Sequence, residues 1–538
     1  MRNNLDRGKM NENEILARRT TSLTRRRLLQ LGSSAAALSA FSPLSRAWAA
    51  SGNDRWPRAV LTGNAAEKVD ERQFLDLGQM RDWYAELDDR GLRATGSRPQ
   101  EQYIDALHDR MERVGIQQVR AEPAPFQRWT PSSWGIDIVA GSEAGAVPAS
   151  SYVPYSGQLP PEGVTAPLVY VKPESVPAGS LQGKVALIDI DIPQTKLQRF
   201  IALSYDGYDP THLLAPERDY VRVWMGNMLS RFAAVRAAGP SAVIAILPLD
   251  NAAAAGMYTP YDGIVRSTPG LYVARDAGAR LKRVAAAGGT VRVKLSAEVD
   301  HFAGRNLVGV IPGRTSEFVI LHSHTDGPNG IEDNGPDLIV AMAQYLARIP
   351  RELLPRGIQI VLTTGHFVGG AGSRAFIRQH REDLLPQVAA AITVEHVGAM
   401  DYALQDGSFR PTGLLEPPIV FMPPDASVLA AEVVRGLASG GMAGTLLAKP
   451  TNPKPKSMDT DSAWPGEGEY MWNNGGLPDA NYICGPNYLF SGGYATVHCV
   501  DFAMMRHAAM GFADMALALT RIPKDKLRVP PPGDRDAG

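Results

Sequence analysis

Cysteine is scarce in this sequence, and neither sign of charge is in excess. Two cysteines among 538 residues exclude a disulfide-rich scaffold and any metal site built from several cysteines. The 55 basic residues are nearly balanced by 56 acidic ones. Apart from one stretch near the N-terminus, no apolar run approaches the roughly 20 residues that a membrane-spanning helix needs. We therefore expect a globular protein that has neither nucleic acid nor membrane as a partner.

The balance of charge is uneven along the chain. Nine basic and three acidic residues stand in the first fifty positions, which leaves 46 basic and 53 acidic residues for the rest. Arg25, Arg26 and Arg27 precede a short and weakly apolar stretch, and a small-x-small pattern follows at Ala47 to Ala49. The stretch is too short for a membrane anchor and resembles a twin-arginine signal peptide. We predict a signal over residues 1–50, the twin-arginine machinery as export partner, and a periplasmic or secreted mature protein.

The rest of the chain predicts an α/β protein in two parts. Helical and strand-like segments alternate from residue 306 onward, whereas short β-like runs rich in proline and glycine occupy the middle. We predict a sheet domain formed by residues 54–152 and 303–520, a smaller β/α domain inserted as residues 153–297, and a loose tail over residues 521–538.

Polar side chains follow three successive strands expected in the sheet domain. Strands are predicted over residues 318–322, 357–364 and 388–394, with helices between them, an order that indicates a mostly parallel, doubly wound sheet. Directly after these strands come possible metal ligands or acid–base groups: His322, His324 and Asp326, then His366, then Glu395 and His396. The carboxyl ends of parallel strands meet at one edge of a sheet, so we expect a pocket there.

The types of residue at this edge favour a metal site. His324, Asp333, Glu395 and a distant His498 would suit zinc or another divalent cation. Each has an ordinary alternative as a loop or capping residue, and Asp333 could serve as a turn residue in Asp-Asn-Gly. The convergence of several such groups on neighbouring strand ends is the reason to prefer the metal.

Several motifs, in order, resemble the di-zinc exopeptidases related to aminopeptidase Y and glutamate carboxypeptidase, peptidase family M28. They are Asn306 to Gly313, His324-Thr-Asp326, Glu332-Asp333-Asn-Gly, Gly365 to Ser373, Thr393 to Gly398, Gly476-Leu-Pro478 and His498 to Asp501. The inserted segment resembles the protease-associated domain common in that family, notably at Ala238 to Ile244. The resemblance implies an α/β fold and His324, Asp333, Glu395 and His498 as metal ligands. It also implies that Asp326 orients His324 and takes part in catalysis.

The sequence departs from the family at its catalytic pair. Where the family has two glutamates, a general base and a zinc ligand, this chain has His366 and Phe367. Phenylalanine cannot bind a metal, so the resemblance favours one zinc ion over two, with a non-standard second site that uses His366 as the alternative. His366 could act as a base or a ligand, or it could only fill space. His322 could also approach the site, whereas His396 is expected to point away from it.

These observations lead to two hypotheses from different classes. The first is an exported metal-dependent hydrolase of peptide or other amide bonds, with a small peptide or amide as substrate and His366 and Asp326 as catalytic residues. The alternative is a catalytically inactive peptidase-like binding protein that retains the fold. A different reaction on the same scaffold also stays open. The spacing of Cys484 and Cys499 is compatible with a disulfide or with two free thiols.

Overall fold

The computed structural model describes residues 56–260, 262–423, 425–452 and 462–529. The predicted signal, residues 1–50, lies outside the described residues. The helices are α2 (Leu77–Asp88), α3 (Arg98–Arg113), α4 (Gln198–Ile201), α5 (Met228–Arg236), α6 (Asn251–Ala254), α7 (Arg275–Ala286), α8 (Gly335–Leu346), α9 (Ala371–His380), α10 (Ser427–Ser439), α11 (Gly468–Asn473), α12 (Phe502–Leu519) and α13 (Lys524–Leu527).

The strands of the large sheet are β1 (Gln117–Ile138), β2 (Gly145–Val147), β3 (Ser151–Tyr152), β4 (Val164–Tyr170), β5 (Val185–Asp189), β6 (Ser204–Tyr208), β7 (Ala242–Ile246), β8 (Gly270–Val273), β9 (Thr290–Ile311), β10 (Phe318–His324), β11 (Gly357–Thr363), β12 (Val388–Val394), β15 (Ile419–Phe421), β16 (Thr445–Ala448) and β17 (Asp479–Ile483). A second sheet pairs β13 (Met400–Gln405) with β14 (Ser408–Leu415).

The centre of the sheet is parallel, as the sequence predicts. Strand β10 lies between β11 and β12 and runs parallel to both, and β17 continues the parallel order beside β12. All three strands foreseen from the sequence are present, and the bounds of β12 are those predicted. The fold class, a mostly parallel α/β sheet, is therefore confirmed. The carboxyl ends of β10, β11 and β12 consequently share one edge of the sheet.

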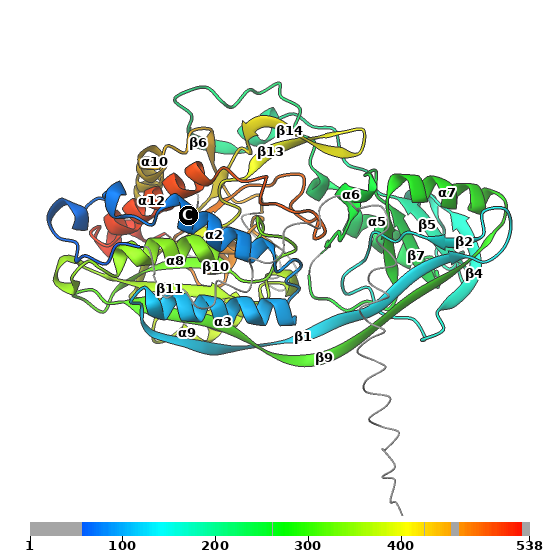
Figure 1. The fold of residues 1–538 in the computed structure, drawn as a ribbon, viewed down its shortest axis with the longest axis horizontal. Coiled ribbons are helices and arrows are strands. Elements are labelled where there is room, and N and C mark those ends of the chain that lie inside the picture. The colour runs from blue at the N-terminus through cyan, green and yellow to red at the C-terminus, as the bar shows by residue number, and fades with distance from the viewer. Residues whose placement is uncertain (1–55, 261, 424, 453–461, 530–538) are drawn as a thin grey trace, which may run out of the picture. The chain divides into compact units, whose positions relative to one another are not determined.

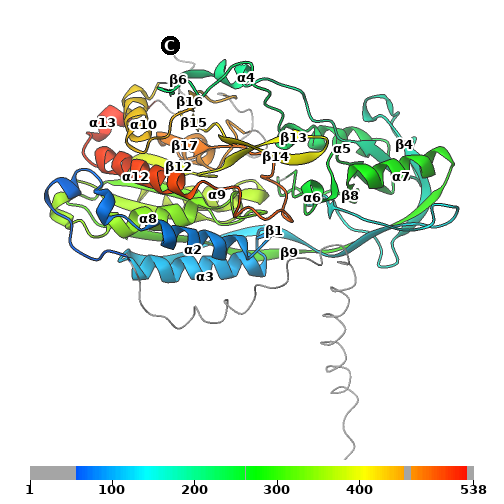
Figure 2. The same cartoon turned by 45° about the horizontal axis from the view of Figure 1, so that its top comes forward.

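Helices cover both faces of this parallel region (Figures 1 and 2). Helices α2, α8 and α12 pack together over one face, and α9 and α11 contact the strands on the other. Alternate residues of β10 separate accordingly, because Val319 and Leu321 join one apolar cluster while Ile320 joins the cluster that also contains Phe376 of α9. Burial on both faces explains why β10 is apolar at consecutive positions rather than at alternate ones.

A long antiparallel ribbon, which the sequence did not predict at this length, extends the sheet. Strands β1 and β9 are 22 residues each and run side by side from the Gln117–Val310 pair to the Ile138–Val291 pair (Figure 1). Because β9 also pairs with β4 and β11, the strands of the middle segment continue the sheet. One exception is β6, which pairs with β16 at the other edge. The division into a sheet domain and an inserted domain stays a prediction.

Two further features bear on the expectations from sequence. Among the described residues, no helix combines the length and the apolarity that crossing a membrane requires. The predicted loose tail begins with a short helix, α13, whose Leu527 is buried, while residues 530–538 lie outside the described part.

Helix α8 begins in unusually close contact with the strand ends. A Cβ added to Gly335 would lie 2.1 Å from the carbonyl oxygen of Val394 and 2.2 Å from Oγ of Ser323. Only glycine allows this approach, which brings the loop before α8 against the ends of β10 and β12. We expect Gly335→Ala to lower the free energy of unfolding by about 1–3 kcal/mol, the usual cost of overpacking.

Urea denaturation of the purified variant measures this loss. Gly135→Ala is a suitable control, because a Cβ at Gly135 meets no atom within 4 Å. Equal stability of the two variants would contradict the close packing at Gly335.

Candidate metal centre

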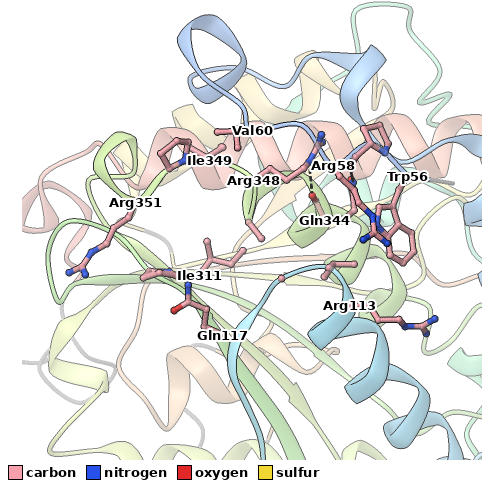
Figure 3. Close-up of a pocket in the computed structure, with 16 residues that line it drawn as sticks. Trp56, Arg58, Val60, Arg113, Gln117, Ile311, Gln344, Arg348, Ile349 and Arg351 are labelled. Carbon is pink, nitrogen blue, oxygen red and sulfur yellow. Dashed lines mark hydrogen bonds between the residues drawn. The ribbon is translucent and has the colours of Figure 1, made fainter. Parts of the chain in front are cut away.

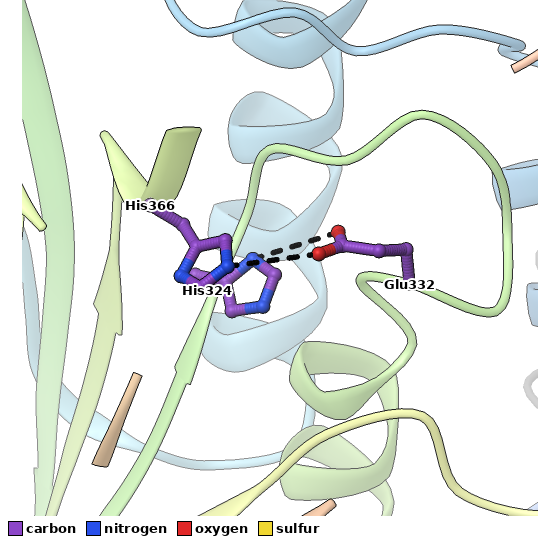
Figure 4. A group of neighbouring side chains, drawn as sticks. All are labelled: His324, Glu332 and His366. Carbon is purple, nitrogen blue, oxygen red and sulfur yellow. Dashed lines mark ion pairs between the residues drawn. The ribbon is translucent and has the colours of Figure 1, made fainter. Parts of the chain in front are cut away.

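Five buried side chains meet at the carboxyl ends of β10, β11 and β12. His324 ends β10, His366 follows β11, and Glu395 and His396 follow β12, while Glu332 comes from the loop before α8. None of the five is more than 6% exposed. Figure 4 shows the rings of His324 and His366 lying over one another, with both facing the carboxylate of Glu332.

The distances among these side chains are short enough for shared coordination. Nε2 of His324 lies 3.4 Å from Oε2 of Glu395. Oε1 of Glu332 lies 3.8 Å from Nε2 of His366 and 3.8 Å from Nε2 of His396. The rings of His324 and His366 stack with centroids 4.1 Å apart. Two overlapping groups of possible ligands result, His324 with Glu332 and His366, and His324 with Glu395 and His396.

Each of the three imidazoles is held through its Nδ1 atom. Nδ1 of His324 donates to the carbonyl oxygen of Asp326 at 2.9 Å, and Nδ1 of His396 donates to the carbonyl oxygen of Cys484 at 2.5 Å. Nδ1 of His366 donates to Oε2 of Glu467 at 2.6 Å. Such contacts fix the ring orientation and direct Nε2 toward the centre, as is usual for metal-binding histidines.

Four buried polar atoms around this point have no hydrogen-bond partner among the described residues. They are Nε2 of His324, Oε2 of Glu332, Oε2 of Glu395 and Nε2 of His396. Unsatisfied buried polar groups are rare in proteins, because each costs about 1–3 kcal/mol. Imidazole nitrogen and carboxylate oxygen are ligands that zinc accepts. The donor set therefore fits a zinc-class cation.

The electrostatics of the cluster favour a positive charge beside the carboxylates. Burial raises the pKa of Glu332 to about 8 and lowers the pKa of His396 to about 4. Burial also disfavours charge on His324, but Glu332 and Glu395 outweigh it and raise the pKa of His324 well above its usual value. Burial raises the pKa of Glu395 by itself, yet His324 outweighs this effect and holds that pKa below its ordinary value. A proton or a metal cation can supply the charge that these carboxylates favour.

The structure brings together three of the six site residues named from sequence. His324, His366 and Glu395 meet at the strand ends. Asp333 instead turns to Arg93, whose Nε lies 2.7 Å from Oδ2 and whose second terminal nitrogen binds Oδ1. His498 is exposed, and its carbonyl oxygen accepts a hydrogen bond from Tyr402.

Asp326 holds the loop after β11. Its carboxylate accepts the backbone N–H groups of His366 and Phe367, each at 3.2 Å, and the hydroxyl of Thr95 at 2.5 Å. His324 is oriented by the main-chain carbonyl of Asp326 rather than by its carboxylate. Asp326 thus fixes the position of His366, and its catalytic role stays a prediction.

The structure adds three residues to the site: Glu332 and Glu467, which sequence reasoning did not single out, and His396, which was considered but expected to point away. Glu332 stands next to the expected Asp333. His396 turns toward the centre because its φ of +56° breaks the strand alternation after Val394. Glu467 reaches His366 from 101 positions away and also accepts the hydroxyl of Ser373 at 2.5 Å. The acidic pair at 332–333 was the sequence signal for Glu332 and the position after the third strand was that for His396, whereas Glu467 had none.

The remaining two residues considered from sequence lie beside the centre. The ring of Phe367 packs against Tyr258 and Phe490, at centroid distances of 5.2 and 6.3 Å, and touches His366 edge-on. His322 is closed off from the centre, because its ring nitrogens contact hydroxyls of Thr393 and Ser373. Cys484 and Cys499 are buried free thiols.

A cavity of about 550 Å³ lies elsewhere (Figure 3). Its lining includes Arg58, Arg113, Arg348 and Arg351, and none of the predicted site residues. Ile311, which also lines it, pairs with Ile358 at the start of β11. This cavity is therefore at the opposite end of the strands from the His–Glu cluster.

A mostly parallel sheet with buried histidines and glutamates at its strand ends defines the class, that of α/β proteins with a candidate metal site at this edge. Residues 306–410 match the sequence model of peptidase family M28. This match confirms the resemblance to that family predicted from the motifs. No curated protein matches the sequence.

Solved structures of peptidases share the fold. A peptidase M28 precursor from Shewanella amazonensis is 14% identical and covers 85% of this chain and 99% of its own, with a TM-score of 0.58. A zinc aminopeptidase from Bacillus subtilis is 12% identical, covers 84% and 98%, and has a TM-score of 0.56. An aminopeptidase from Aneurinibacillus is 16% identical, covers 87% and 97%, and has a TM-score of 0.50.

Proposed function

We propose that the protein is a metal-dependent hydrolase of peptide or other amide bonds. One observation carries this proposal: Nε2 of His324 and Oε2 of Glu395 are buried, lie 3.4 Å apart and lack other partners, at strand ends within the segment that matches the M28 peptidases. His324 and Glu395 would hold a zinc-class ion. When bound, such an ion polarises the scissile carbonyl and acidifies a water molecule.

His366 is suited to proton transfer in this reaction. Its Nδ1 hydrogen bond to Glu467, at 2.6 Å, fixes the ring and stabilises the positive charge that appears when Nε2 takes a proton. Glu467 is itself held by Ser373 and Thr363. His366 thus takes the place of the glutamate base of the family, and Glu467 acts as its positioning residue.

The finer proposal concerns substrate and location. The relatives include zinc aminopeptidases, so we propose a small peptide or amide as substrate, cleaved at one end of the chain. The leader at residues 1–50 supports export by the twin-arginine route and a periplasmic or secreted location.

The alternative, an inactive peptidase-like binding protein, rests on Phe367. This side chain stands at a ligand position of the family but packs among aromatic rings. Metal analysis of protein purified without chelator, together with a panel of aminoacyl, carboxy-terminal and amide substrates, distinguishes the two functions. Turnover that chelator abolishes and zinc restores supports the hydrolase; bound peptide without turnover supports the alternative.

We expect His366→Ala to lower kcat by about 10²–10⁴-fold, the usual contribution of a general acid–base group. Glu467→Gln should lower kcat by about 10–100-fold and shift the pH–rate profile, because the charge that supports His366 is lost. Steady-state kinetics across a pH range measures both effects.

His380 provides the matched control, since Nε2 of this buried histidine also pairs with a glutamate, Glu122, at 3.0 Å, but outside the cluster. His380→Ala should reduce stability and leave kcat unchanged. Full turnover in His366→Ala would refute the assigned role.

A further inference from the structure

Three unsatisfied buried atoms define a compact donor set around His324. Nε2 of His324, Oε2 of Glu395 and Nε2 of His396 have no hydrogen-bond partner among the described residues. One ligand atom from each of these residues lies within 4.8 Å of the others. The separation of 3.4 Å between His324 and Glu395 is close to the edge of a zinc tetrahedron, about 3.4 Å for bonds of about 2.1 Å.

Both imidazole rings of this set are held in one orientation and one tautomer by their hydrogen bonds. A carbonyl oxygen can only accept a hydrogen bond, so the Nδ1 atoms of His324 and His396 carry the hydrogen in their bonds to Asp326 and Cys484. In each neutral ring Nε2 then keeps its lone pair, which is the state that a metal requires.

The backbone conformation at His396 directs this imidazole ring toward the centre. Its φ of +56° is rare for a residue other than glycine, and such conformations are held in place by their surroundings. The thiol of Cys484 donates to the carbonyl oxygen of His396 at 2.8 Å, and the next residue, Val397, donates its N–H to Asn334 at 3.0 Å. The turn that aims His396 at the centre is therefore fixed from both sides.

Asp333 is already paired with a positively charged side chain, that of Arg93. Both of its carboxylate oxygens bind the guanidinium of Arg93, and both side chains are fully buried. Arg93 is held in turn by the carbonyl oxygens of Leu87 and Asn329, at 3.2 and 2.7 Å. The guanidinium thus supplies the positive charge that a second metal ion would bring to this carboxylate.

We propose that the metal centre holds a single zinc-class ion bound by His324, Glu395 and His396, with Arg93 in place of a second ion. Two histidines and one glutamate leave an open coordination position, as in catalytic zinc sites. Glu332 belongs to the same cluster, because its Oε1 lies 3.8 Å from Nε2 of His396. This assignment rests on the proposed metal-dependent function, but it concerns the ligands rather than the reaction.

Zinc content and affinity test the assignment without any assay of activity. The full chain, purified without chelator, is analysed by mass spectrometry of the metal and by competition with a chelator. We expect one zinc per chain in the wild type and in His498→Asn. In His396→Asn the affinity should fall by at least about 100-fold, since a direct ligand should cost no less than an outer-shell partner. Asparagine tolerates a positive φ, so this variant keeps the turn.

Asp333→Asn provides a second, independent variant. Its Oδ1 can still accept from Arg93, although the buried guanidinium loses its counter-charge and stability should fall. We expect this variant to retain one zinc per chain. Loss of zinc in His498→Asn or Asp333→Asn, two zinc ions in the wild type, or none, would overturn the assignment. One zinc bound through His396 without hydrolysis would instead refute only the proposed function.

Discussion

Replacing Glu395 with glutamine is expected to remove bound metal and hydrolytic activity together. Oε1 of Glu395 accepts the N–H of Glu467 and the amide of Asn481, both at 2.8 Å, and a glutamine oxygen can keep these bonds. Only Oε2, which faces His324 at 3.4 Å, loses its charge. We expect kcat/KM to fall by about 10²–10³-fold, the scale seen when an electrostatic group at a reacting centre is removed.

Steady-state kinetics and metal analysis on the same preparation measure both losses. Glu469→Gln is the matched control: Glu469 is also a buried glutamate, but it accepts from Ser462 and lies outside the cluster. The control should keep its zinc and its turnover. Zinc content and kcat/KM equal to those of the wild type in Glu395→Gln would show that Glu395 is no ligand.

Replacing Arg93 with methionine is expected to produce the largest loss of stability. Arg93 and Asp333 form an ion pair with both side chains fully buried, and removal of the guanidinium leaves a buried carboxylate without its partner. We expect the free energy of unfolding to fall by about 3–5 kcal/mol, as for other buried pairs that lose one member. Chemical denaturation of the apoprotein gives this value without a contribution from bound metal.

A double-mutant cycle separates the energetic contribution of the ion pair from that of the buried aliphatic part of the Arg93 side chain. Asp333→Asn combined with Arg93→Met should be more stable than Arg93→Met alone, because the uncompensated charge is gone. Arg72→Met serves as the exposed counterpart: its pair with Asp70 is largely solvated and should contribute little to stability. A loss in Arg93→Met no larger than in Arg72→Met would contradict the importance of the buried pair.

The regular elements around the site could be predicted closely from the sequence. The strand over residues 388–394 has the predicted bounds, and helices lie between the three predicted strands as expected. These segments bury one or both faces, so their apolar pattern and their glycine-rich ends can be recognised from a short stretch of sequence. The partners of β6 and the length of the β1–β9 ribbon depend on segments far apart in the chain and had no local signal.

The site was predictable in part, because some of its residues follow elements that have a local sequence pattern and others do not. His324, His366 and Glu395 were identified because each directly follows a strand, and parallel strands bring such positions to one edge. Glu467 could not be identified, because it lies in a loop 101 positions from His366 and belongs to no motif. His396 was expected to point away, an inference that assumes continued strand alternation and fails at a positive φ.

The sequence by itself determined which chemical groups gather at the strand ends: imidazoles and carboxylates, with no glutamate pair at 366–367. The tertiary structure alone decided which member of the Glu332–Asp333 pair faces the centre. Arg93, 240 positions away, binds Asp333, so Glu332 takes the place beside the histidines. Adjacent residues in a loop project in different directions, and only a distant partner and the backbone dihedrals choose between them. Such a choice is made by packing and charge pairing, which no local pattern encodes.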